Sequence, residues 1–134
     1  AVGESGTILR WDGMTWSLSP VPSSAQHSVI YGVWGSDRNN VWAVGESGTI
    51  LKLTGSSWSS VVSRTQQNLS GVWGSSAGNV WAAGDSGTIL RWNGSDWSRI
   101  TSGTTQNFWD TWGSGTDLWA VGDAGTIVRW NQSI

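Results

Sequence analysis

The sequence predicts an all-β protein, a β-propeller built from four-stranded antiparallel blades, and three observations lead to this prediction. A Gly-Glu/Asp-Ser/Ala-Gly turn followed by Thr-Ile-Leu/Val occurs four times in 134 residues, beginning at Gly3, Gly45, Gly84 and Gly122. The copies are about 39 residues apart, a period typical of propellers and related arrays, whose units bury their apolar faces against neighbours. The segments between turns are short and no segment has helical periodicity.

Each period contains four segments with the composition of β-strands. In the third period these are 69–74, 79–83, 88–92 and 96–100, rich in β-branched and aromatic residues. Glycine-containing turns separate them, among them Asn93-Gly94, a strong hairpin signal. Four antiparallel strands in about 39 residues match one propeller blade.

We expect a single repeat domain, residues 1–134, that forms part of a propeller. Its approximate repeats are 1–29, 30–68, 69–107 and 108–134. The chain holds about 3.4 periods, whereas propellers usually close with four to eight blades. Ala1-Val2-Gly3 begins within a repeat, which suggests a processed chain or a fragment. Because a partial ring leaves strand edges unpaired, we predict a homo-oligomer, most simply a dimer that completes a ring.

The composition excludes several kinds of partner. Charged residues make up 12% of the chain and the net charge is −2, so we expect no binding of nucleic acid and no binding to an anionic membrane surface. No apolar run is long enough to span a bilayer, so no membrane insertion is expected. Cysteine is absent, which excludes disulfides and thiolate metal sites. The localisation stays open, with a secreted or cell-surface protein as the working expectation and the cytoplasm as the alternative.

Few side chains are suited to catalysis or metal binding. His27 is the single histidine, and no nucleophile elbow accompanies it. Most of the nine carboxylates lie in or beside turns, where they cap the backbone, and no Asp-x-Asp-x-Asp calcium loop is present. We therefore expect no enzyme activity, no catalytic residue, no metal and no cofactor.

A basic residue recurs at one position of the third strand of each repeat. These residues are Arg10, Lys52, Arg91 and Arg129. We expect them to point outward and to pair with turn carboxylates of the neighbouring hairpin. Binding of an anion or sugar phosphate between blades is the alternative.

Thirteen tryptophans are the strongest signal in the chain, and they have two interpretations. Large rings at one register fill the space between blades, which is the preferred role of Trp42, Trp81 and Trp119. Packing nearer the central axis is expected of a second register, formed by Trp34, Trp73 and Trp112. A third register consists of Trp11, Leu53, Trp92 and Trp130. Because leucine replaces tryptophan once there, we expect partial exposure and propose Trp11, Trp92 and Trp130 as candidate ligand contacts.

Trp109 stands outside these registers. Its position holds Tyr31 and Ser70 in the two preceding repeats, and the residue after it is Asp110, where the other repeats have glycine. An aromatic ring beside a carboxylate is suited to a hydroxylated ligand, so Trp109, Asp110 and Tyr31 are candidate binding residues. Filling of an irregular seam between two chains is the alternative for Trp109.

The order Val-Trp-Gly-Ser, Val-Trp-Ala-Val, Gly-Thr-Ile-Leu-Arg-Trp and Trp-Ser resembles the tectonin repeat along essentially the whole chain. The chain departs from that pattern at Trp34, Trp73 and Trp112, where tectonins usually have a small residue. The resemblance implies a lectin-like propeller that binds glycans, made multivalent by its repeated blades and by oligomerisation. The alternative is a protein-interaction or assembly scaffold, or a propeller fragment that closes by oligomerising without a dedicated ligand.

Overall fold

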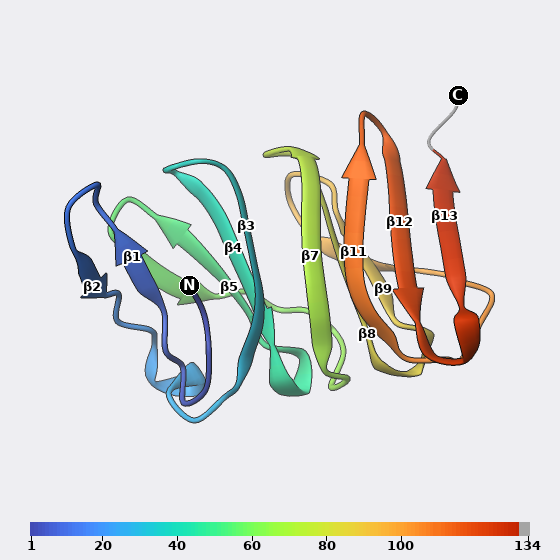
Figure 1. Cartoon of the computed structure of the whole chain (residues 1–134), viewed down its shortest axis with the longest axis horizontal. Helices are drawn as coiled ribbons and strands as arrows, with labels where there is room; N and C mark the ends of the chain where they lie inside the picture. Colours follow the sequence, from blue (N-terminus) through green and yellow to red (C-terminus); the bar gives the residue numbers. More distant parts are fainter. Residues whose placement is uncertain (132–134) are drawn as a thin grey trace.

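The computed structural model describes residues 1–131 and confirms the all-β prediction (Figure 1). Its strands form four separate antiparallel sheets, which we call the first to fourth blades. The first blade contains β1 (Leu9–Trp11) and β2 (Trp16–Leu18). The second contains β3 (Ile30–Asp37), β4 (Asn40–Gly45), β5 (Ile50–Thr54) and β6 (Ser57–Ser60). The third contains β7 (Leu69–Ser76), β8 (Asn79–Gly84), β9 (Ile89–Trp92) and β10 (Trp97–Ile100). The fourth contains β11 (Phe108–Ser114), β12 (Asp117–Gly122) and β13 (Ile127–Asn131).

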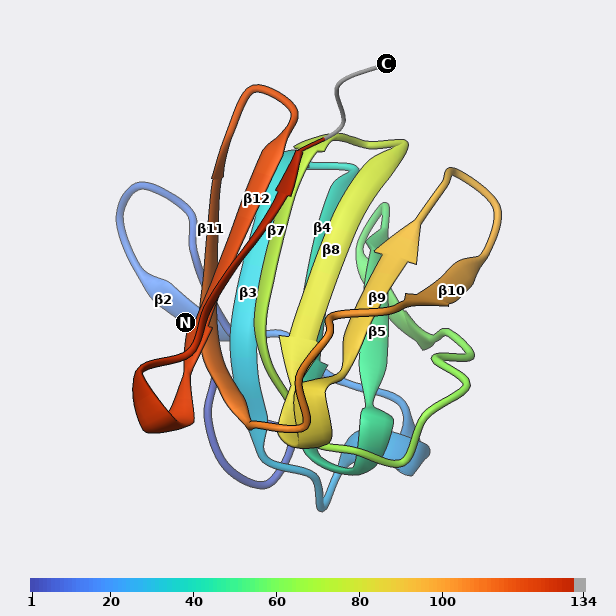
Figure 2. The ribbon, with the colours of Figure 1, turned by 90° about the vertical axis from the view of Figure 1, so that its right-hand side faces the viewer.

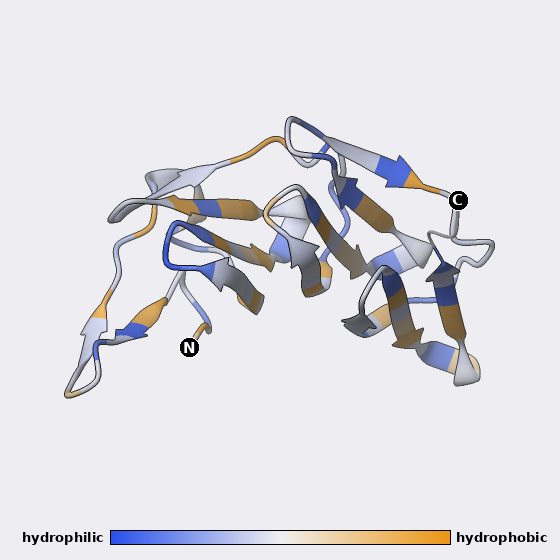
Figure 3. Ribbon diagram, turned by 90° about the horizontal axis from the view of Figure 1, so that it is seen from above, coloured by the Kyte–Doolittle hydropathy of each residue, from blue (hydrophilic) through white to orange (hydrophobic). Residues whose placement is uncertain are grey.

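The blades stand side by side and fan outward, as a partial β-propeller does. Within each complete blade the strands follow one another in chain order, from β3 to β6 and from β7 to β10. The inner strands β3, β7 and β11 pack directly against one another, while the later strands diverge (Figures 2 and 3). No helix in the described residues is long and apolar enough to cross a membrane.

The repeated turn between the second and third strands of a blade has a common geometry. In the second blade it is a short 3-10 turn, η2 (Glu46–Gly48), closed by a hydrogen bond from the Thr49 amide to the Glu46 carbonyl. Ser47 and Gly48 have φ of 53° and 75°, in the left-handed region. The sequence predicted a tight turn with glycines at positive φ, but the residue before the glycine also adopts it. The other turns of this kind are η3 (Asp85–Gly87) and η4 (Asp123–Gly125), and the remaining 3-10 turn is η1 (Ser23–Ala25).

Apolar side chains fill the gaps between successive blades and form three core clusters. In the second gap, between the second and third blades, the Trp42 ring lies 4.9 Å from Trp92 and 5.2 Å from Trp97, measured between ring centroids. In the third gap, Trp81 lies 5.6 Å from Trp130. Trp42 and Trp81 are fully buried, as expected for rings that fill the space between blades.

Glycines on the inner strands make room for the second tryptophan register. A Cβ added at Gly74 would lie 2.6 Å from the Trp34 ring, and one added at Gly113 would lie 2.3 Å from the Trp73 ring. Each ring therefore rests on the glycine of the following blade, which explains why Trp34 and Trp73 are only partly exposed.

The fourth blade departs from the predicted packing. Trp112 is 64% exposed and Trp119 is 37% exposed, although both registers are covered in the preceding blades. The expectation of packing was wrong for Trp112 and only partly right for Trp119. Within residues 1–131 no further blade follows, so these two rings lack the neighbour that covers their equivalents.

Candidate binding surfaces

The inner strands carry a repeated irregularity at their beginnings. In the second blade, the pairing register between the first and second strands shifts between Ile30 and Gly32. In the fourth blade it shifts between Phe108 and Asp110. The third blade shifts in the same way between Leu69 and Gly71. Each shift leaves one residue outside the ladder, and a β-bulge of this kind redirects a side chain. The bulged residues are Tyr31, Ser70 and Trp109.

These bulges lie on strands that approach each other closely. A Cβ at Gly32 would lie 3.3 Å from the Ser70 carbonyl oxygen, and one at Gly71 would lie 2.8 Å from the Thr111 amide nitrogen. The three bulges therefore follow one another across neighbouring blades. We call the surface formed by Tyr31, Ser70, Trp109 and Asp110 the inner rim.

The inner rim contains three of the residues predicted as binding residues. Tyr31 is 46% exposed and Trp109 is 62% exposed, so both rings are accessible. The Asp110 carboxylate is exposed and accepts a hydrogen bond of 2.8 Å from the Thr111 amide. The structure thus places two accessible aromatic rings and one accessible carboxylate at related positions of the inner strands.

The register of Trp11, Trp92 and Trp130 is not uniform. Trp11 is 50% exposed and packs against Trp16, with ring centroids 5.5 Å apart. Trp92 is only 8% exposed, because it lies between Trp42 and Trp97, so the predicted partial exposure was wrong for this residue. Trp130 is half-buried against Trp81. The structure therefore does not bring the three rings together into one site, and Trp11 is the most exposed of the three.

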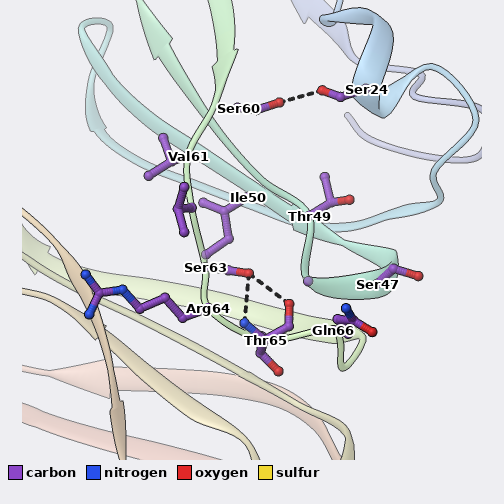
Figure 4. A pocket seen from close by; sticks show the side chains of 12 residues that line it. Ser24, Ser47, Thr49, Ile50, Ser60, Val61, Ser63, Arg64, Thr65 and Gln66 are labelled. Atoms are coloured by element: carbon purple, nitrogen blue, oxygen red, sulfur yellow. Dashed lines mark hydrogen bonds between the residues drawn. The ribbon is translucent and has the colours of Figure 1, made fainter.

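A groove rich in hydroxyl groups opens where the second blade leads into the third (Figure 4). Its volume is about 510 Å³, and Ser24, Ser47 and Ser60 are among its lining residues. The Ser63 hydroxyl donates to the Thr65 carbonyl at 3.1 Å, forming a local turn. Arg64, between them, has φ of 63° and is exposed. This groove offers hydroxyls and one guanidinium to a polar ligand.

A similar groove recurs one blade later. It has a volume of about 540 Å³, and Ser102 and Thr104 take the places of Ser63 and Thr65. Gly103, with φ of 82°, stands where Arg64 stands in the second blade. Our sequence reasoning missed both grooves. The signal was present as a Ser-x-Thr triplet that recurs 39 residues apart, with glycine marking the left-handed position.

The repeated cations do not form the predicted ladder of ion pairs with carboxylates of the neighbouring hairpin. In the described residues only Arg129 has a carboxylate partner, Asp117, which is the first residue of β12 in the same blade. The Arg91 guanidinium donates to the Asn79 side chain at 3.0 Å. The positive charges lie instead over indole rings, with Lys52 5.2 Å from the Trp42 centroid and Arg91 5.3 Å from the Trp81 centroid. For Lys52 and Arg91, cation–π contact takes the place of the predicted ion pairs.

No group of three or more His, Asp or Glu side chains in residues 1–131 is arranged to hold a metal ion. His27 is exposed in the loop after η1. The accessible groups that the candidate surfaces present are aromatic rings, hydroxyl groups, the Asp110 carboxylate and the Arg64 guanidinium.

No protein-family model matches the chain, and no curated protein matches it. Among solved structures, the chain is similar to YCF48 bound to D1 peptide, with a TM-score of 0.74 and 21% identity. The match covers 99% of this chain and 46% of that chain, so the present chain spans less than half the length of that structure. The likeness establishes the fold as a β-propeller.

Proposed function

We propose that this chain is a non-enzymatic scaffold that binds a segment of a protein partner on its inner rim. The observation that carries the proposal is the pair of accessible rings at equivalent bulges, Tyr31 and Trp109. Accessible tyrosine and tryptophan side chains are the commonest anchors of protein interfaces. The similar solved propeller was determined with a peptide bound, which supports a peptide ligand here.

The chemistry of the inner rim favours a polypeptide with apolar side chains and a basic group. The rings of Tyr31 and Trp109 provide apolar area, and the Asp110 carboxylate is accessible to a lysine or arginine. The bulges also leave backbone groups outside the ladder, which can hydrogen-bond to a peptide main chain.

A peptide array on the intact protein, followed by calorimetric titration of the best peptides, tests this proposal. We expect Trp109→Ala and Tyr31→Ala each to weaken binding about ten-fold or more, since loss of an anchor costs about 2 kcal/mol. Ser70→Ala, at the bulge of the third blade, is the matched control and should have little effect on peptide affinity. A variant that carries both Trp109→Ala and Tyr31→Ala should lose most of the binding. The proposal is contradicted if the peptides bind this double variant as tightly as they bind the original protein.

A glycan ligand is the second candidate, and the tectonin-like repeat pattern and the adjacent Trp109 and Asp110 favour it. An open indole face stacks on the C–H face of a sugar, while a carboxylate accepts hydrogen bonds from its hydroxyls. A glycan array decides between the candidates. Saturable binding of a coherent glycan set that is lost in Trp109→Ala would replace the protein partner with a carbohydrate.

We also propose that two copies associate through their end blades. Trp119 on the fourth blade is the equivalent of Trp42, and Trp11 and Trp16 on the first blade are the equivalents of Trp92 and Trp97. All three are exposed here, at 37%, 50% and 57%. Packing Trp119 of one copy on Trp11 and Trp16 of another would therefore repeat the second gap. Such a heterologous contact closes a ring when two copies exchange it.

Sedimentation at several concentrations tests the association. We expect a mass of two chains for the original protein and of one chain for Trp119→Glu, with the same far-ultraviolet spectrum. A single-chain mass for the original protein at every concentration would refute this part of the proposal.

A further inference from the structure

The turn between β9 and β10 carries a reactive pair of residues. Asn93 is followed by Gly94, and it is the only asparagine of the chain that precedes a glycine. Attack by the main-chain nitrogen of the next residue on the side-chain amide of asparagine closes a succinimide ring. A glycine at the next position leaves this nitrogen unshielded, because it carries no side chain. Asn93 is therefore the asparagine at which the main chain approaches the side-chain amide most freely.

The nucleophile of this reaction is free in the folded protein. Residues 93–96 are exposed, and a Cβ added at Gly94 would meet, beyond its chain neighbours, only the Gly78 Cα at 3.9 Å. No group of residues 1–131 accepts a hydrogen bond from the Gly94 amide. The nitrogen that must lose its proton is therefore held by no other group of the described chain.

The side-chain carbonyl of Asn93 is held and polarised by the turn. Its Oδ1 accepts hydrogen bonds of 2.9 Å from the Ser95 amide and 3.0 Å from the Asp96 amide. Negative charge develops on this oxygen when a nucleophile adds to the carbonyl carbon. Main-chain amides directed at such an oxygen stabilise the transition state, as they do in an oxyanion hole. The turn thus activates the carbonyl group that it holds.

An equivalent turn in the first blade shows how a carboxylate fits at this position. Asp12 occupies the register of Asn93, and its Oδ1 accepts bonds of 2.8 Å from the Met14 and Thr15 amides. The following glycines also agree, with φ of 105° at Gly13 and 102° at its counterpart. The amides of Thr15 and Met14 hold the pKa of Asp12 below its usual value. Asp12 is therefore an anion at neutral pH and resists nucleophilic attack, whereas the amide of Asn93 is neutral.

We propose that Asn93 is a site of non-enzymatic modification, at which asparagine is converted into aspartate and isoaspartate. The Gly94 nitrogen gives its proton to a base of the solvent and forms a bond to the Asn93 Cγ. The bond from Cγ to Nδ2 breaks, and this nitrogen takes a proton from water and leaves as ammonia. Water then opens the succinimide ring. Cleavage of the new bond to Cγ gives aspartate, and cleavage of the original peptide bond gives isoaspartate, so the reaction consumes water and releases ammonia.

The two products differ in their effect on the second gap. Trp92 and Trp97 flank the turn, pair across β9 and β10, and pack on Trp42. Aspartate leaves the main chain unchanged, as the turn of Asp12 shows. Isoaspartate adds an atom to the main chain, so the turn no longer matches the pairing of the two tryptophans. Isoaspartate therefore loosens the second gap, while aspartate leaves it intact. This site is separate from the inner rim and does not depend on the function proposed for it.

Peptide mapping by mass spectrometry on the folded protein, kept in mildly alkaline buffer, tests the modification. Asn107 is the internal control, because its Oδ1 also accepts a main-chain hydrogen bond, from Ser86, but a phenylalanine follows it. We expect Asn93 to be converted while Asn107 stays unmodified, at a rate that rises with pH because the Gly94 nitrogen must lose its proton. Asn93→Gln, which lengthens the side chain, should stay unmodified. The proposal is wrong if Asn93 of the folded protein stays unmodified while a peptide of residues 90–97 is converted, or if Asn107 reacts as fast.

The effect on the second gap is tested on the separated products. Each product carries a new negative charge, so anion exchange separates both from the original protein, and a protease that cleaves before aspartate but not before isoaspartate tells them apart. Salt in the buffer screens the repulsion between the new carboxylate and Asp96. Asn93→Asp, which reproduces the aspartate product, should melt at the temperature of the original protein, and the isoaspartate product should melt lower. A lower melting temperature of Asn93→Asp would refute the comparison with Asp12, and an isoaspartate product as stable as Asn93→Asp would refute the link to the second gap.

Discussion

The first and second gaps are built from the same repeat and have different interiors. In the second gap, Trp42 is buried among Trp92, Trp97 and Lys52. In the first gap, between the first and second blades, Leu53 and Trp58 border a cavity of about 200 Å³. The gaps also differ in how the blades are joined at the repeated turn. The Asn68 side chain accepts a hydrogen bond of 2.9 Å from the Ser47 amide, whereas Val29 occupies the register of Asn68 one blade earlier.

The difference shows that one register of a repeat becomes core or surface according to its neighbour. Trp42, Trp81 and Trp119 share a motif, a strand position and a basic partner, yet Trp119 alone is exposed. In an array each unit depends on the interface with the next one, so the end units lose part of their stabilisation. The second and third gaps should therefore hold most of the free energy of folding.

Removing an indole ring should give the largest difference in stability loss between the second gap and the exposed side of the fourth blade. We expect Trp42→Ala to lower the free energy of unfolding by about 3–5 kcal/mol, because it leaves a large cavity in the core. Trp119→Ala should cost about 1 kcal/mol when both variants are measured on the dissociated single chain, since that ring is then partly in water. Urea unfolding followed by circular dichroism compares them. Equal losses in the two variants would mean that the fourth blade is covered in solution.

Adding a methyl group beneath a ring should give the next largest effect. In Gly113→Ala the new Cβ would lie 2.3 Å from the Trp73 ring, and a side chain locked between blades cannot move away freely. We expect a loss of about 1–3 kcal/mol from this overpacking. The control is Gly78→Ala, where the added Cβ has no neighbour within 4 Å. If Gly113→Ala were as stable as Gly78→Ala, the blades would be able to separate slightly without losing free energy of folding.

Substitution of Asn68, whose side chain hydrogen-bonds to the preceding blade, should have a smaller effect on the free energy of unfolding. Asn68→Ala removes the bond to the Ser47 amide and a second bond of 3.1 Å to the Asp85 carboxylate, so we expect a loss of about 1 kcal/mol. The reverse change, Val29→Asn, places an amide beside the turn at Ser5 and should stabilise the first gap by a few tenths of a kcal/mol. Thermal unfolding measures both changes. Stabilisation by Asn68→Ala would contradict the role given to this side chain.

The smallest expected effect concerns the turn between β3 and β4. The Asn40 side chain and the Asn39 amide donate to the Asp37 carboxylate and hold its pKa below the usual value. A lowered pKa in the folded state stabilises the protein above the unfolded pKa, and this contribution disappears as the pH falls through the folded value. The melting temperature of Asp37→Asn should therefore fall less between roughly pH 5 and pH 2 than that of the original protein. An identical pH dependence would show that this turn does not couple to unfolding.

Much of the fold was predictable from local chemistry. The segments predicted in the third repeat agree with β7 to β10 to within two residues at each boundary, because strand composition and turn residues are local properties. The left-handed φ of Ser47 was not predictable from its type, since serine seldom adopts it. The same conformation occurs at Ser5, Ser86 and Ala124, so it belongs to the repeated turn as a whole.

The candidate site was predictable only in part. Tyr31, Trp109 and Asp110 were recognised as departures from the repeat, but the bulge that they share depends on pairing with the second strand. The leucine at position 53, where other repeats have tryptophan, was interpreted as a sign that this register is partly exposed. Trp92 at the same register is buried against Trp42 of the preceding blade, and Leu53 is half-buried, so exposure at this register is set by the neighbouring blade. A single-repeat comparison cannot show such a relation, because the interacting residues belong to different repeats.

The buried indole N–H groups have a consequence for experiments on exchange with solvent. They belong to Trp42, Trp81, Trp97 and Trp130. A buried N–H exchanges its hydrogen for deuterium only when the structure around it opens. Trp42 and Trp97 therefore report on the second gap and Trp81 and Trp130 on the third, each through its own resonance. Their exchange rates would show whether neighbouring blades open together or one at a time.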